Sequence, residues 1–172
     1  MSEAKKPSRN ENFIRFVMEK ISQKDNGAVA ALKRADNPAT EYQCWEYLAR
    51  FIDIDKDYER LPFAVIGSAI AKAKVEQNGT VKIGQAIARC YEEGNQSDQA
   101  KAKLRRLLAC DTTEEVCRIL RSLFSLISSK GGAVLDYVSL LNDLCYYNQY
   151  SQRVKSQWAQ DFYRHYDIEE NA

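Results

Sequence analysis

The sequence predicts an all-α protein of about nine helices, and three observations lead to that fold class. Apolar residues recur at helical spacing along most of the 172 residues. Glycine and proline are scarce, with 7 and 3 residues, so turns must be few and the elements between them long. Hydrophobic residues make up 45% and charged residues 28% of the chain, which are ordinary values for a globular protein that buries a core.

The first three helices are predicted from apolar spacing and from capping residues. A helix is expected to start near Asn12 and to be broken at Asn26-Gly27, and a short helix over 28–35 follows. Asp25 or Asn26 would cap that short helix. A third helix is expected to be capped by Thr40, and its apolar face would carry Tyr42, Trp45, Leu48, Ala49 and Ile52.

The middle of the chain is predicted to hold a central apolar helix and a linker. The central helix is expected to run from Phe63 to about Val75, with Pro62 in its first turn. Proline has no backbone N–H, and in the first turn that N–H would have no partner within the helix. Apolar residues continue to recur at helical spacing over 83–90. The polar stretch 92–97 has no large apolar residue and is the best linker, which would divide the chain into parts 1–94 and 97–172.

Four helices are predicted in the C-terminal part. Ser97 or Asp98 caps the first of them, and Thr112 to Glu115 form a capping signature for the second. Gly131-Gly132 is expected to end the second helix. A third helix lies between Leu135 and Cys145. The apolar positions of the last helix are Val154, Trp158 and Phe162, followed by Tyr166.

Composition excludes several classes of site. The five cysteines contain no C-x-x-C pair and indicate buried thiols in a reducing cytoplasm. His165 is the single histidine, so zinc-finger and His-rich metal sites cannot be built. No apolar run approaches the ~20 residues of a membrane span. We therefore expect a cytoplasmic protein with no metal, no cofactor and no catalytic residue.

Two weaker patterns leave alternatives open. The alternating carboxylates between Asp53 and Glu59 hint at a calcium loop, but the glycine of such a loop is missing, and a solvated acidic loop is favoured. Tyr146, Tyr147 and Tyr150 form a cluster that could stack on nucleic-acid bases. Clusters of this kind are more often packing residues at the end of a helix.

The near-neutral net charge of +1 hides an uneven distribution. Residues 1–24 have a net charge of +3, 25–62 of −3 and 131–172 of −3, whereas 63–100 are balanced. Residues 101–130 hold 7 basic and 3 acidic side chains, a net charge of +4. The sequence thus predicts a basic helical hairpin within an otherwise acidic protein.

Helical geometry arranges these basic residues in stripes. Residues three or four apart share a helix face, so Lys101 lines up with Arg105. A second stripe, without a carboxylate, carries Arg118, Arg121, Ser122, Ser125 and Ser129. Cationic side chains beside hydroxyl donors are what phosphate contacts require. An ordinary solvated helix face explains the spacing equally well.

Three stretches resemble the CasB family, the small subunit of the type I-E CRISPR surveillance complex known as Cascade. GAVAALKRA (27–35) is similar to an early Gly-x-x-x-x-Leu-basic-Arg segment, and VKIGQAIARC (81–90) to a Ser-Leu-Gly-x-Ala-Leu pattern. The longest stretch covers most of 101–163 and includes KLRRLLACDTTEEV, ILRSLFSLISSKGGAVLDYVSLLNDLCYY and RVKSQWAQDFY. Lys82 departs from the pattern, because it stands where the family usually has serine.

The resemblance implies two helical sub-domains, no enzymatic activity and copies that pack head to tail. It implies a basic surface beside the guide RNA–target DNA hybrid that helps hold the displaced DNA strand, with other Cascade subunits as neighbours. The positions that match its basic motifs are Lys33, Arg34, Lys101, Lys103, Arg105, Arg106, Arg121, Arg153 and Lys155. Arg118 joins this set of predicted nucleic-acid-binding residues through the stripe that it shares with Arg121.

Two other classes of function are weighed against this one. A helical protein–protein interaction adaptor with no nucleic-acid role would need an exposed apolar patch, and the acidic segment 25–62 would suit a docking surface. An enzyme is disfavoured, because no pattern supplies a nucleophile for His165.

Overall fold

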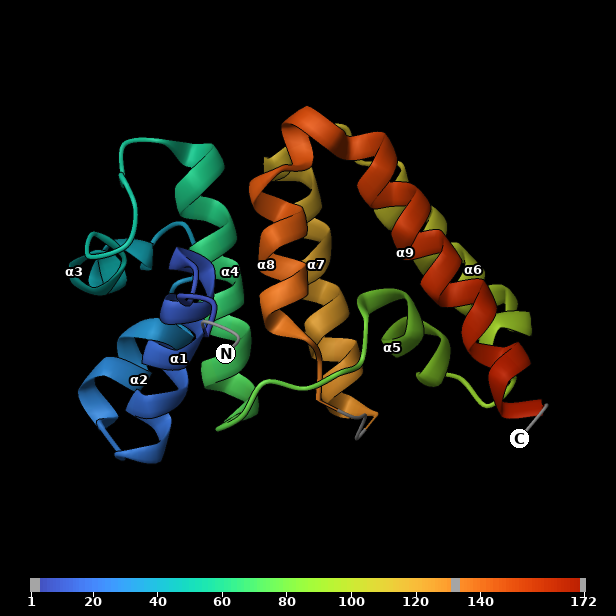
Figure 1. Cartoon of the computed structure of the whole chain (residues 1–172), viewed down its shortest axis with the longest axis horizontal. Helices are drawn as coiled ribbons and strands as arrows, with labels where there is room; N and C mark the ends of the chain where they lie inside the picture. The colour runs from blue at the N-terminus through green and yellow to red at the C-terminus, as the bar shows by residue number, and fades with distance from the viewer. Residues whose placement is uncertain (1–3, 131–133, 171–172) are drawn as a thin grey trace.

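The computed structural model describes residues 4–130 and 134–170, the last six by backbone alone, and its fold is all-α as predicted (Figure 1). Within the described residues the only pairing of strand type is an isolated bridge between Val81 and Leu135. None of the helices in this part of the chain is long and apolar enough to cross a membrane. The helices, in order, are α1 Arg9–Ser22, α2 Asn26–Lys33, η1 Glu41–Cys44, α3 Trp45–Leu48, α4 Asp57–Ala73, α5 Ile83–Arg89, η2 Gly94–Gln96, α6 Asp98–Leu108, α7 Thr113–Ser129, α8 Tyr137–Cys145 and α9 Tyr147–Glu170.

The N-terminal lobe packs α1, α2, η1 and α3 around the buried helix α4. Phe13 on α1 is fully buried and meets the rings of Phe51 and Phe63, with centroids 5.4 and 4.7 Å away. α4 is buried on nearly every side from Pro62 to Ala71, as expected of a central helix. Its far side packs on α7 and α8, so the two halves of the molecule share one apolar core.

The C-terminal lobe is built from α5, α6 and α9, with α7 and α8 between it and α4 (Figure 1). α5 makes its main contact with α9, and not with α1–α4. A Cβ atom at Gly84 of α5 would overlap the backbone of Trp158 and Phe162 on α9, so glycine is what permits this close approach. The chain therefore leaves the N-terminal lobe between α4 and α5, ahead of the boundary that was expected at residues 94–97.

The stretch 92–97 is held by the C-terminal lobe and is not a free linker. Asn95 is 3% exposed, and its amide donates to the backbone carbonyl of Tyr163 on α9 at 2.7 Å. η2 occupies the centre of this stretch, with Gly94 in the left-handed region at φ 57°. The polar composition predicted a linker, but here the side chains of Asn95 and Ser97 satisfy backbone groups.

Several predicted caps are confirmed. Ser97 accepts from the backbone N–H of Ala100 at the start of α6, and Asp25 accepts from Ala28 at the start of α2. Thr112 and Glu115 form a reciprocal capping box on α7. The Gly131-Gly132 stop lies outside the described residues, as does the side chain of Tyr166.

Three helix predictions were wrong in detail. α1 begins at Arg9, one turn earlier than expected, because Ser8 caps it. α4 begins at Asp57, so Pro62 lies inside the helix and not in its first turn. The helix expected after Thr40 is a 3₁₀ turn followed by one α turn, which leaves Tyr42 60% and Trp45 37% exposed.

Candidate nucleic-acid interface

Helix α6 presents the basic side chains that were predicted from the sequence. Ser97 and Asp98 favour its start, and Arg105 and Arg106 in its last turn suit the negative end of the helix dipole. The buried residues on its apolar side are Ala100, Leu104 and Leu107, each no more than 1% exposed. Because that side is fixed in the core, Arg105 and Arg106 face solvent and Lys101 and Lys103 lie half-buried.

The four cations of α6 are free of carboxylate partners within the described part of the chain. None of the ion pairs or side-chain hydrogen bonds there involves the side chain of Lys101, Lys103, Arg105 or Arg106. Asp98 is the single acidic residue of the helix. An anion that approaches α6 therefore displaces no partner among the described side chains, and free cations of this kind are what phosphate contacts require.

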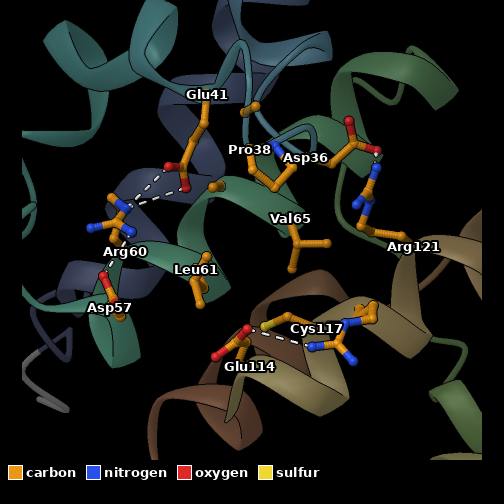
Figure 2. A pocket seen from close by; sticks show the side chains of 13 residues that line it. Asp36, Pro38, Glu41, Asp57, Arg60, Leu61, Val65, Glu114, Cys117 and Arg121 are labelled. Atoms are coloured by element: carbon orange, nitrogen blue, oxygen red, sulfur yellow. Dashed lines mark hydrogen bonds and ion pairs between the residues drawn. The ribbon is translucent and has the colours of Figure 1, made fainter.

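The two arginines of α7 lie in a different environment, at a groove of about 270 Å³ between the lobes (Figure 2). Arg118 pairs with Glu114 one turn earlier at 3.4 Å, and Arg121 pairs with Asp36 of the N-terminal lobe at 3.8 Å. Asp36 also accepts from Lys72 of α4. The expectation of a stripe without carboxylates was wrong, since one partner lies on the same helix face and the other comes from a distant segment.

The opposite wall of this groove also carries paired charges. Arg60 donates through Nε to both carboxylate oxygens of Glu41, at 3.1 and 3.3 Å, and pairs with Asp57 at 2.7 Å. The groove therefore alternates between positive and negative groups, as the sticks in Figure 2 show. Such a lining favours a protein or zwitterionic surface over a continuous phosphate backbone.

The hydroxyl groups of the α7 stripe are already used within the helix. Ser122 donates to the carbonyl of Ile119 at 2.9 Å, and Ser129 donates to that of Leu126 at 2.8 Å. Ser125 makes the same kind of bond to Arg121 at 3.4 Å. Because each hydroxyl hydrogen is donated to a carbonyl of the same helix, only the oxygen is left, and it can accept but not donate. These hydroxyls therefore do not serve as the phosphate donors that were expected.

The basic positions on α9 lie near the end of α6. Lys155 pairs with Asp111 in the α6–α7 turn at 3.4 Å, whereas Arg153 is exposed and makes no ion pair with a described residue. Lys155 and Arg106 both act electrostatically on the thiol of Cys110, which locates them at the same end of the α6–α9 pair. Lys155 thus lies beside the C-terminal end of α6, whereas Arg153 lines a hollow at the turn between α8 and α9 with Tyr146 and Tyr150.

The early basic pair lies away from this surface, in the N-terminal lobe. Arg34 is exposed and donates to the side chain of Gln43 at 3.0 Å, and Lys33 is half-buried at the end of α2. The structure therefore does not bring all ten predicted residues into one patch. It groups six of them around α6 and α9, two in the inter-lobe groove and two on α2.

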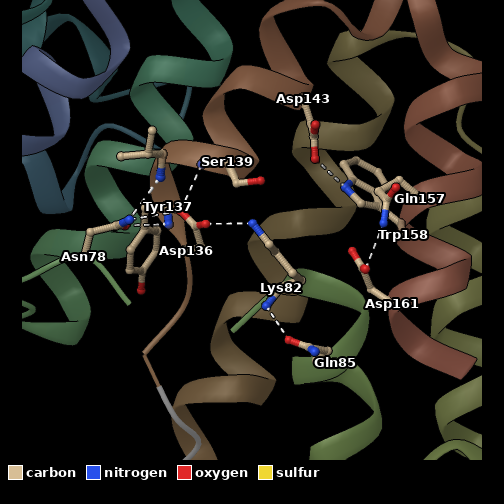
Figure 3. Close-up of polar contacts among 11 residues, drawn as sticks. Asn78, Lys82, Gln85, Asp136, Tyr137, Ser139, Asp143, Gln157, Trp158 and Asp161 are labelled. Atoms are coloured by element: carbon tan, nitrogen blue, oxygen red, sulfur yellow. Dashed lines mark hydrogen bonds and ion pairs between the residues drawn. The ribbon is translucent and has the colours of Figure 1, made fainter. Parts of the chain in front are cut away.

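Lys82, which departs from the family pattern, has a structural partner. Its ammonium donates to Asp136 at 2.7 Å, and Asp136 also accepts from Asn78 and from the backbone of Ser139 (Figure 3). Burial would raise the pKa of Asp136, but these hydrogen bonds outweigh it and hold the pKa below its ordinary value. The Leu-Asp-Tyr motif thus caps α8 and holds the 75–82 connection in place.

Trp158 and Asp143 form the second polar contact in this region. The indole Nε1 of Trp158 donates to Asp143 at 2.9 Å (Figure 3). Burial raises the pKa of Asp143 in spite of that bond. Within the described residues no group of three or more His, Cys, Asp or Glu side chains is placed to hold a metal ion. Burial also raises the pKa of the cysteine thiols, to about 12 for Cys44, so these groups are not activated nucleophiles.

The fold and the free cations of α6 define an all-helical, two-lobed protein with a basic surface on one lobe. Solved structures of this class match almost the whole chain. CasB from M. ruber superposes with a TM-score of 0.71 at 23% identity, covering 96% of this chain and 98% of that one. A Cse2-family CRISPR-associated protein from Thermus thermophilus gives 0.75 at 20% identity, with 91% and 99% covered. A chain of a CRISPR RNA-guided surveillance complex gives 0.73 at 20% identity, with 95% and 96% covered.

The family follows from the sequence itself. The model of the family described as CRISPR-associated protein Cse2 matches residues 28–163, and the chain belongs to that family. This confirms the resemblance noted from the motifs, since CasB and Cse2 structures share the fold. No curated protein sequence matched the chain.

Proposed function

We propose that the chain is a non-catalytic, sequence-independent nucleic-acid-binding small subunit of a CRISPR RNA-guided surveillance complex. The observation that carries the proposal is the set of four cations on α6 that pair with none of the described carboxylates, in a chain of the Cse2 family. The structural similarity to a chain of a surveillance complex supports the assignment as a subunit. The unpaired thiols suit a reducing cytoplasm.

The mechanism is electrostatic. Lys101, Lys103, Arg105 and Arg106 neutralise backbone phosphates and release counterions, which weakens binding as salt rises. Arg153 and Lys155 extend the contact from α9. Because guide pairing already reads the target sequence, a subunit that follows the backbone only has to favour the hybrid and the displaced strand over the original duplex. Arg118 and Arg121 take part only where phosphates replace their present carboxylate partners.

Charge also favours head-to-tail packing of copies within the complex. The acidic residues around Asp53 and Asp55 are exposed on the N-terminal lobe, whereas α6 displays free cations on the other lobe. The acidic lobe of one copy therefore complements the basic lobe of the next.

A second candidate function rests on a different surface. Tyr42 and Trp45 are exposed close together in sequence on η1 and α3, which suits a helical adaptor that binds only proteins. This function requires the α6 cations to be dispensable for every interaction of the chain.

Binding to DNA by charge-matched variants separates these functions. Arg105→Glu/Arg106→Glu is compared with Lys6→Glu/Arg15→Glu, which makes the same charge change at exposed, unpaired positions of the N-terminal region. We expect the α6 variant to lose most of its binding to single- and double-stranded DNA, and the control to keep most of it. Equal affinity for the wild type and the folded α6 variant would overturn the proposal.

A further inference from the structure

Two adjoining hollows cross the elbow between α8 and α9. They have volumes of about 380 and 450 Å³ and share Asn142 and Tyr146 in their walls. The first reaches Tyr58 at the start of α4, and the second reaches Tyr150 and Arg153 at the start of α9. We name these two adjoining hollows together the elbow groove, and none of the α6 cations is among the residues that line them.

Three exposed tyrosines line the elbow groove. Tyr58, Tyr146 and Tyr150 are 48, 56 and 53% exposed. The rings of Tyr146 and Tyr150 lie 6.2 Å apart at 55°, so they do not stack on each other and their faces stay open to a ligand. Large aromatic rings that expose half their surface in one groove are typical of a binding site and not of a core.

The local backbone explains why these rings point outward. Tyr147, between them in sequence, is fully buried, stacks on Trp158 and donates its hydroxyl to the carbonyl of Cys110. Tyr150 has non-helical φ and ψ of −130° and 34°, which kinks α9 after its first turn. A buried anchor beside a kink holds Tyr146 and Tyr150 at the surface.

The polar groups that line the elbow groove differ in whether they have partners. Asn10 is 7% exposed, and its Oδ1 accepts no hydrogen bond, although its Nδ2 donates to Asn142 at 2.7 Å. A buried acceptor without a partner is costly, but this oxygen is enclosed by the protein and is not open to a ligand in the groove. Arg153 is exposed without an ion pair to a described residue. Of the lining carboxylates, Glu59 forms an ion pair with Arg9 at 3.7 Å, and Asp143 accepts a hydrogen bond from the neutral indole of Trp158.

Half-exposed aromatic rings beside an arginine without an ion pair to a described residue match one class of ligand. Unpaired nucleobases offer flat π faces to tyrosine, and the phosphates of the strand that carries them pair with arginine. A base-paired duplex hides those faces within its stack. A purely acidic peptide would leave the tyrosine faces unused.

We infer that the elbow groove binds unpaired bases of single-stranded nucleic acid by stacking on Tyr58, Tyr146 and Tyr150. This inference rests on the proposed function and adds to it a site that distinguishes single strands from duplex. The α6 surface would hold phosphates of either form, whereas the elbow groove would hold bases only where a strand is unpaired.

Three probes test the inference on the full chain: an oligothymidylate of about 16 nucleotides, the same length of abasic phosphodiester backbone, and a duplex. The test variant is Tyr146→Ala/Tyr150→Ala. The matched control is Tyr42→Ala/Tyr163→Ala, which removes tyrosines that are 60 and 46% exposed outside the groove. Tyr146→Phe/Tyr150→Phe keeps the rings and removes only the hydroxyls.

We expect Tyr146→Ala/Tyr150→Ala to weaken oligothymidylate binding by about 5- to 150-fold, the effect of losing at least one stacked base. Binding of the abasic strand and the duplex should stay unchanged, and the phenylalanine variant and the control should bind oligothymidylate like the wild type. Equal losses on oligothymidylate and abasic strand, or no loss at all, would overturn the inference. So would an unchanged affinity for DNA combined with failure to join partner proteins, which would identify the groove as a protein interface.

The two proposals fail in different ways. If Arg105→Glu/Arg106→Glu leaves all three probes unaffected while the tyrosine variant loses oligothymidylate, the α6 surface is wrong and the elbow groove stands. If the α6 variant weakens all three probes while the tyrosine variant matches the wild type, the elbow groove is wrong and the α6 surface stands. Circular-dichroism melting of each variant shows that the fold is retained.

Discussion

Trp158 is the residue whose removal should cost the most stability. It is 1% exposed, its ring stacks on Tyr147 with centroids 5.9 Å apart, and its Nε1 donates to Asp143. Trp158→Ala should lose about 3–5 kcal/mol of unfolding free energy through the cavity alone. Loss of the partner of the buried Asp143 carboxylate adds about 1–3 kcal/mol. That sum approaches the whole stability of a domain, which is about 5–15 kcal/mol.

Urea denaturation followed by far-ultraviolet circular dichroism measures these costs. Trp158→Phe keeps most of the ring and removes the bond to Asp143, so it should cost about 1–3 kcal/mol. Tyr42→Ala is the control, because that ring is 60% exposed and its removal should cost under about 1 kcal/mol. A cost below about 1 kcal/mol for Trp158→Ala would refute the packing of α9 described above.

Three further changes test other contacts. Arg118→Gln/Arg121→Gln removes the ion pairs with Glu114 and Asp36 and should lower the melting temperature more than Arg105→Gln/Arg106→Gln, which removes no ion pair with a described residue. Gly84→Ala should cost about 1–3 kcal/mol in urea denaturation, since its Cβ would overlap the α9 backbone. Asp136→Ala should cost about 1–2 kcal/mol at neutral pH through the lost cap. Because the folded pKa of Asp136 lies below its unfolded value, its contribution is present above pH ~4 and lost as the pH falls through the folded pKa.

Each of these changes has a result that would contradict its reasoning. Equal melting temperatures for the α6 and α7 glutamine variants would show that the carboxylate pairs contribute nothing. A wild-type stability for Gly84→Ala would show that α5 and α9 do not approach closely. A cost for Asp136→Ala that persists unchanged in acid would show that the ionised carboxylate is not what stabilises α8.

The caps and the buried face of each helix could be predicted from the sequence, because they depend on residues only a few positions apart. Ser97 and Thr112 cap α6 and α7 through side chains three residues from their partners. The buried positions on α9, Val154, Trp158 and Phe162, follow from helical spacing and are at most 6% exposed. The exposure of Arg105 follows in the same way, since the apolar side of α6 was already visible.

Contacts between distant segments could not be predicted in this way. Asp36 lies far from Arg121 in sequence, and no periodicity signals that they meet across the inter-lobe groove. Lys82 and Asp136 are likewise brought together only by the fold. The exposure of Tyr42 and Trp45 escaped prediction because a 3₁₀ turn replaces the regular helix that the spacing assumed.

The salt dependence of duplex DNA binding tests the central claim most directly. Each phosphate neutralised on a duplex contributes about 0.9 to the slope of log K against log salt concentration. We predict that Arg105→Gln/Arg106→Gln lowers the magnitude of that slope by about 1.8, whereas Lys6→Gln/Arg15→Gln leaves it unchanged. A slope that is the same for the wild type and the α6 variant would contradict the claim that the α6 cations bind phosphates.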